Sequence, residues 1–149
     1  MKALYPSVPR SEAREAVKAA LEEREDTTVP TDAFLELMDL VLNNNLFEFN
    51  GKRYIQREGT AIGSRLGKNY ACTYLGSWEN QLHMKSTKQP TFYGRYIDDI
   101  FGIWEHSKED LENYVALANS IHEKIQLTLR WSKSSIEFLD VLLKIGPKN

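Results

Sequence analysis

Cysteine is nearly absent from this 149-residue chain. Cys72 stands alone, so an internal disulfide is excluded. The three histidines, His83, His106 and His122, are scattered without the spacing of a metal site. No run approaches the roughly 20 apolar residues that a membrane-spanning helix needs, and no apolar signal-peptide segment begins the chain. We therefore expect a soluble intracellular protein with no membrane partner.

Charge is nearly balanced over the whole chain, with 19 basic and 21 acidic residues, but its distribution is uneven. Residues 52–95 hold 8 Lys and Arg against 2 Asp and Glu, whereas residues 1–51 hold 5 against 10 and residues 96–149 hold 6 against 9. A basic middle segment suits contact with nucleic-acid phosphates. A solvated helix face has the same pattern, so charge alone leaves both interpretations open.

Periodic apolar residues predict helices and hairpins with no linker between them, so one domain is expected over residues 1–149. The order of elements favours an α+β fold with helices packed on one face of an antiparallel sheet. Asn50-Gly51 predicts a tight hairpin, and Ser107 with Asp110 predicts a capping box. The full set is the end of a strand at 1–5, helices at about 11–25, 31–43, 62–84 and from 107, hairpins at 46–56 and 92–104, and strands near 126–131 and 136–143.

Asp98 and Asp99 lie between two apolar and aromatic runs, at the tip of the second of these hairpins. Two adjacent carboxylates repel each other, so a divalent cation is their natural partner. Mg²⁺ favours carboxylate oxygens together with waters and substrate phosphates, and paired ions of this kind catalyse phosphoryl transfer. Taken alone, however, an aspartate pair in a turn is more often a simple polar turn.

A glycine-containing segment, residues 56–64, joins the first hairpin to the longest helix. Its glycines let the backbone pass close to a base pair or a sugar, and Arg57, Arg65 and Lys68 can contact phosphates. An ordinary helix entry explains the same residues, so this segment by itself is a weak signal.

Four segments together resemble the reverse transcriptases, most closely those of Penelope-like retroelements, whose palm is related to that of telomerase. They are Leu4-Tyr5-Pro6-Ser7-Val8-Pro9, residues 44–63 with Gly59-Thr60-Ala61-Ile62-Gly63, Arg95-Tyr96-Ile97-Asp98-Asp99-Ile100-Phe101, and Ile136-Glu137-Phe138-Leu139-Asp140-Val141. Four motifs in the family's order are far more specific than any one of them. The resemblance implies a ferredoxin-like polymerase palm with part of the fingers. It also implies an RNA-directed DNA polymerase that transfers a nucleotide from a dNTP to a primer 3′-hydroxyl.

The resemblance further implies roles for single residues. Asp98 and Asp99 would be the catalytic pair that binds Mg²⁺ or Mn²⁺, and Tyr5 matches the aromatic residue under the sugar of the incoming nucleotide. The parent protein would act inside the cell, in the nucleus. The implied nucleotide-binding residues are Tyr5, Gln56, Gly59, Thr60, Ala61 and Gly63, and the implied contacts to RNA template and DNA primer are Arg57, Arg65, Lys68, Tyr96, Phe138 and Leu139.

The chain departs from the family's pattern at its start. Counting the family's spacing back from Tyr5 puts the first metal-binding aspartate directly before Met1, and the thumb and most of the fingers would lie outside residues 1–149. We therefore expect a folded fragment that does not polymerise on its own. A chain that starts inside a strand would leave a sheet edge open, which predicts a homodimer formed by strand pairing.

Two other classes of function stay open. A non-catalytic nucleic-acid-binding module would hold a strand by stacking and phosphate contacts, through Tyr54, Arg57, Arg65 and Tyr70. A domain that only assembles with a protein partner would suit the acidic first helices.

Overall fold

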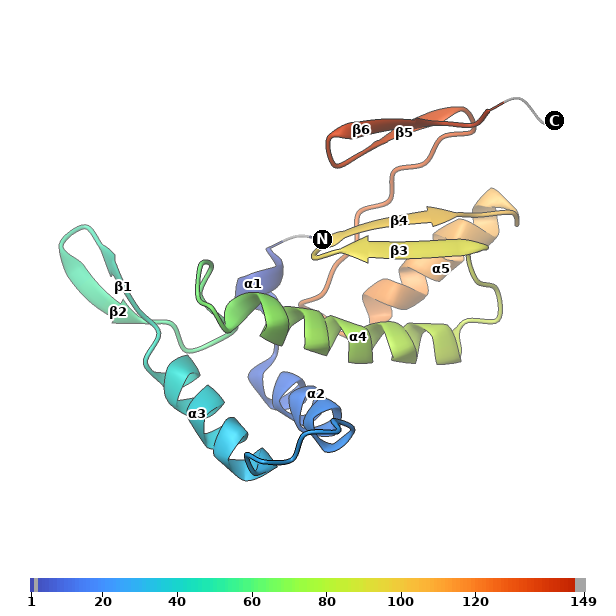
Figure 1. Ribbon diagram of the computed structural model, residues 1–149. Coiled ribbons are helices and arrows are strands. Elements are labelled where there is room, and N and C mark those ends of the chain that lie inside the picture. Colours follow the sequence, from blue (N-terminus) through green and yellow to red (C-terminus); the bar gives the residue numbers. More distant parts are fainter. Residues whose placement is uncertain (2, 147–149) are drawn as a thin grey trace. The chain divides into compact units, whose positions relative to one another are not determined.

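The computed structural model describes residue 1 and residues 3–146 (Figure 1). Their helices and short antiparallel strands confirm the α+β class. The chain divides into two compact units. We call Ala3–Met84 the N-terminal unit, and Met1 with the residues from Lys85 onward the C-terminal unit. Within the described residues, no helix combines the length and the apolarity needed to cross a bilayer.

The N-terminal unit contains helices and one hairpin, and α2 packs against α3. Buried side chains come from each of its helices, and those of α4 recur every four residues at Tyr70, Tyr74, Trp78 and Leu82. This spacing confirms the helical periodicity of the sequence. The elements are α1 (Leu4–Ser7), α2 (Arg10–Glu22), α3 (Thr31–Asn43), β1 (Leu46–Phe49), β2 (Lys52–Ile55) and α4 (Gly67–Lys85), the last residue of which belongs to the C-terminal unit.

The hairpin of β1 and β2 forms where the sequence predicts it. Asn50 and Gly51 make the two-residue turn, with φ of 51° and 72°. Both are positive, as a turn matched to the twist of two antiparallel strands requires.

The C-terminal unit contains two hairpins and one long helix. Its elements are β3 (Phe92–Tyr96), β4 (Asp99–Ile103), α5 (Lys108–Ile121), β5 (Ser135–Phe138) and β6 (Val141–Lys144). Phe101 of β4 contacts Phe138 of β5, with ring centroids 5.5 Å apart. The described strands form three separate two-stranded sheets. The sequence had predicted one antiparallel sheet.

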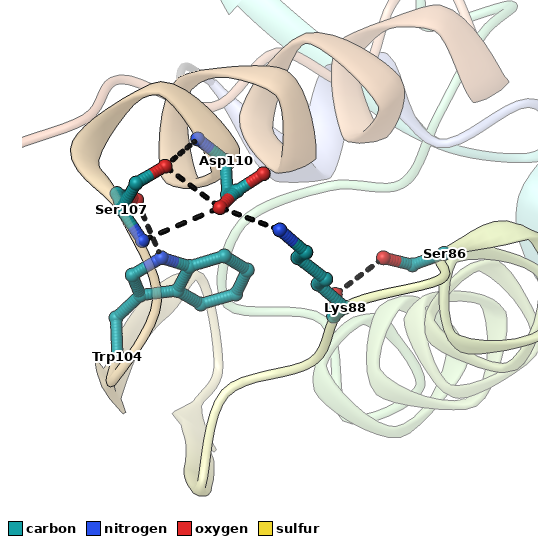
Figure 2. A network of polar contacts seen from close by, with 5 residues as sticks. All are labelled: Ser86, Lys88, Trp104, Ser107 and Asp110. Carbon is teal, nitrogen blue, oxygen red and sulfur yellow. Dashed lines mark hydrogen bonds and ion pairs between the residues drawn. The ribbon is translucent and has the colours of Figure 1, made fainter.

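A polar network holds the start of α5 (Figure 2). Asp110 N donates to Ser107 Oγ over 3.1 Å, and the Asp110 carboxylate accepts from Ser107 N, which is the predicted capping box. Lys88 Nζ also donates to Asp110 Oδ2 over 2.8 Å. The hydrogen bonds from Lys88 and Ser107 hold the pKa of Asp110 below its ordinary value. The start of α5 is thus tied to the loop between α4 and β3.

Two predictions about the first half of the chain are wrong. Residues 4–7 form one helical turn instead of the end of a strand, because a turn brings the buried Leu4 and Val8 to one side. The long helix starts at Gly67 and not at residue 62. Positive φ at Gly63 (89°) and a turn bond from Ser64 N to Ala61 O delay its start.

Two predictions about the last strands are also wrong. Residues 126–131 form no strand, since the side chain of Asn119 takes the place of a partner strand: its Oδ1 accepts from Leu127 N and its Nδ2 donates to Leu127 O. Residues 136–143 are not one strand, because a turn with Leu139 at φ 53° separates β5 from β6.

Candidate functional site

The predicted catalytic aspartates lie at a two-residue turn in the C-terminal unit. Tyr96 of β3 pairs with Asp99 of β4, so Ile97 and Asp98 are the central turn residues. Ile97 has φ 56°, a conformation that costs a β-branched residue about 1–2 kcal/mol. Arg95 Nη1 donates to Ile97 O over 3.0 Å and braces the turn. The turn is therefore held in one conformation at some cost in strain.

The Asp98 side chain is half-buried and that of Asp99 is exposed, so both carboxylates are accessible to a cation. Carboxylate oxygens are the ligands that Mg²⁺ and Mn²⁺ prefer, with waters or phosphates filling the other positions. Among the described residues, no group of three or more His, Cys, Asp and Glu is placed to hold a metal ion. Asp98 and Asp99 thus offer two carboxylate ligands of the kind that Mg²⁺ and Mn²⁺ prefer.

Met1 lies against the same turn. Its amino nitrogen donates to the Asp98 carbonyl oxygen over 2.8 Å. The backbone of residue 1 is thus adjacent to the aspartates, although the two are 97 positions apart in sequence.

In the N-terminal unit, Tyr5 contacts the segment predicted to bind nucleotide. Thr60 N donates to Tyr5 O over 2.9 Å. Gly59 is buried with φ 61°, and a Cβ at this position would lie 2.2 Å from the same Tyr5 oxygen. Only glycine fits so close to the Tyr5 backbone. Two of the four motifs are therefore in direct backbone contact.

Arg10, which the sequence analysis missed, fixes the position of this segment. Its guanidinium donates to three carbonyl oxygens: Gln56 O at 2.7 Å, Leu42 O at 2.8 Å and Gly59 O at 3.1 Å. It thereby joins α2, the end of α3 and the segment after β2. A signal was present, because a cation at the first position of a helix is unfavourable to the helix dipole and suggests another role.

The remaining residues of the segment have different environments. The side chain of Gln56 donates to Glu58 O (2.9 Å) and Thr60 O (3.1 Å), so it shapes the loop. Thr60 is 1% exposed, and its hydroxyl has no hydrogen-bond partner. Ala61 is half-buried, and Gly63 is exposed in an open turn. The shape of the segment from Gln56 to Gly63 is therefore set mainly by its backbone and not by exposed side chains.

The predicted nucleic-acid contacts are mostly accessible. Arg57, Arg65 and Lys68 are exposed in the N-terminal unit, and Tyr96 is exposed at the aspartate turn of the C-terminal unit. Leu139 is exposed at the β5–β6 turn, whereas Phe138 is half-buried against another ring.

Tyr70, which the binding-module alternative had used for stacking, is 1% exposed. Burial raises its pKa to about 12. The ring is therefore a core residue and offers no face to a base.

Comparisons of the chain with family models, with curated proteins and with solved structures found no match. The resemblance to reverse transcriptases therefore depends on the four sequence motifs.

Proposed function

We propose that the chain is the palm portion, with part of the fingers, of an RNA-directed DNA polymerase of the Penelope-like reverse transcriptase type. The observation that carries this proposal is the hydrogen bond from Thr60 N to Tyr5 O, with Gly59 packed against the same oxygen. These residues are far apart in sequence, and the polymerase interpretation needs them together under one nucleotide. A coincidental set of motifs has no reason to meet in this way.

In this proposal Asp98 and Asp99 hold Mg²⁺ or Mn²⁺. The metal, when bound, neutralises charge on the dNTP phosphates and favours ionisation of the primer 3′-hydroxyl. The protein contributes positioning. The braced turn fixes the backbone that carries both carboxylates, and Arg10 fixes the loop from Gln56 to Thr60 that would contact the nucleotide.

The contact between Met1 and Asp98 shows where a residue added before Met1 would begin. A residue joined to the Met1 nitrogen would start within hydrogen-bonding distance of the aspartate turn. Adding an aspartate before Met1 should therefore complete a set of three carboxylates and tighten metal binding.

The test is Mn²⁺ titration followed by NMR line broadening. Broadening should begin at the amides of residues 98 and 99 and should disappear in Asp98→Asn. Asp140→Asn is a matched control, because Asp140 occupies the same position of the β5–β6 turn. A protein extended by one N-terminal aspartate should bind Mn²⁺ more tightly than the original chain. Broadening that is equally sensitive to Asp140→Asn would refute the metal site.

Polymerisation is measured separately, as incorporation of labelled dNTP on a DNA-primed RNA template. We expect no incorporation by the original chain, and the same assay applies to the extended protein. If nucleic acid binds while Mn²⁺ does not reach Asp98 and Asp99, the non-catalytic binding module becomes the better explanation. The exposed Arg57, Arg65 and Lys68 favour that second candidate.

A further inference from the structure

The β1–β2 hairpin exposes an aromatic face. Residues directly opposite in an antiparallel pair lie on the same side of the sheet. The register pairs Phe47 with Tyr54 and Phe49 with Lys52, so one face carries three rings and one ammonium group. The rings of Phe47 and Tyr54 stack at 5.4 Å with an interplanar angle of 20°. They form a flat platform.

This platform is open to solvent. Phe47, Phe49 and Tyr54 are 50%, 70% and 42% exposed, and Figure 1 shows the hairpin extending beyond α3. Three exposed rings on one small surface are unusual unless a partner covers them. The other face carries the pairs Leu46 with Ile55 and Glu48 with Arg53, so the hairpin's acidic side chain lies away from the rings.

A cationic pocket lies at the base of the same hairpin. It has a volume of about 330 Å³ and is lined by Arg10, Asn43, Ile55 and Arg57. The guanidinium of Arg10 is held by carbonyl oxygens, so its charge has no carboxylate against it among its hydrogen-bond partners. Arg57 is exposed beside it. Because Ile55 belongs to the face opposite the rings, only Lys52 of these cations shares the face of the aromatic platform, and Arg57 lies just past the base of the hairpin.

We propose that this surface binds single-stranded nucleic acid, with bases stacked on Phe47, Phe49 and Tyr54 and phosphates against Lys52 and Arg57. Aromatic rings interleaved with cations are the combination that holds single strands without sequence preference. The choice of an RNA strand rests on the proposed polymerase function. A second copy of the chain is a poorer occupant, because a twofold interface through this face would set its cations against each other.

The test uses fluorescence anisotropy with a short labelled single-stranded RNA and a matched abasic strand, in a buffer without divalent metal. Phe49→Ala should weaken RNA binding by about 5- to 150-fold and should leave binding of the abasic strand unchanged. Arg57→Gln should weaken both and reduce the salt slope by about 0.7. Phe49 and Arg57 are exposed, so neither change should disturb folding, which circular dichroism would verify.

The controls are Leu37→Ala, which changes another exposed apolar residue, on α3, and Lys18→Gln on α2, and both should leave RNA binding unchanged. If Phe49→Ala changes RNA binding no more than Leu37→Ala does, the proposal is wrong. It is also wrong if sedimentation shows a dimer that Phe49→Ala dissociates, since the face would then belong to a second copy. Because no metal is present, failure here is separate from failure of the Mn²⁺ site at Asp98 and Asp99.

Discussion

Replacing Arg10 with alanine should destabilise the N-terminal unit by about 3 kcal/mol. The change removes three hydrogen bonds from a charged donor to backbone carbonyl oxygens, Gln56 O, Leu42 O and Gly59 O, and a longer one to Asn43 Oδ1 at 3.4 Å. Each such bond contributes about 1.5–3 kcal/mol. The total is smaller than their sum, because the bonds share one side chain and the part-buried carbonyl oxygens regain water. At about 2–4 °C per kcal/mol, the melting temperature should fall by roughly 6–12 °C.

Urea denaturation gives the change in free energy, and hydrogen exchange at the Thr60 amide gives its location. That amide should exchange faster, because it bonds to Tyr5 O in the segment that Arg10 holds. Arg14→Ala is the matched control: one helical turn later on α2, Arg14 forms a single ion pair with Asp39 at 3.0 Å, with both side chains about 40% exposed. Arg14→Ala should lower the free energy of unfolding by about 0–1 kcal/mol. Equal losses of stability in the two variants would refute the role of Arg10 in holding the segment from Gln56 to Thr60.

Four further substitutions test segments on either side of the chain's midpoint. In thermal melts, Gly59→Ala should destabilise the protein by more than about 2 kcal/mol, since φ is positive and the new methyl group would lie 2.2 Å from a backbone oxygen. Gly76→Ala in α4 has open space around it, so the same melts should show stabilisation by about 0.5–1 kcal/mol. Ser107→Ala should cost about 1 kcal/mol through loss of the helix cap. Because Lys88 and Ser107 lower the pKa of Asp110 from its ordinary 3.8, the stability it contributes is present above that value and is lost as the pH falls through the lowered one. Asp110→Asn should therefore flatten the acid limb of the urea midpoint plotted against pH.

Elements governed by local rules could be predicted from the sequence. The Asn50-Gly51 hairpin follows from turn geometry, and the capping box of Ser107 and Asp110 follows from hydrogen bonding within one helical turn. The α4 stripe follows from helical periodicity. In each case neighbouring residues contain all the information that fixes the structure.

Elements decided by distant contacts could not be predicted in this way. Residues 126–131 alternate like a strand, yet Asn119 satisfies Leu127 with a side-chain amide. Residues 4–7 are too short to have a preference of their own, and their helical turn is fixed by buried neighbours and by the bond from Thr60. Arg10 belongs to the same class, because its partners lie more than 30 positions away.

The strain at Ile97 can be measured, because the same hairpin supplies its own reference residue. Glycine in a strand costs about 0.5–1 kcal/mol relative to alanine through lost chain entropy, and Ile103→Gly in β4 should show at least that loss. Ile97→Gly suffers the same entropy loss but recovers the roughly 1–2 kcal/mol stored at φ 56°.

The two variants should therefore differ by about 1–2 kcal/mol in urea denaturation, with Ile97→Gly the more stable. Equal destabilisation would mean that the turn stores no strain. Proteins retain such strained residues where the conformation itself is needed. If the strained turn fixes the carboxylates of Asp98 and Asp99, Ile97→Gly should bind Mn²⁺ more weakly although it is the more stable of the two. A variant that keeps full Mn²⁺ affinity would separate the strain from the metal site.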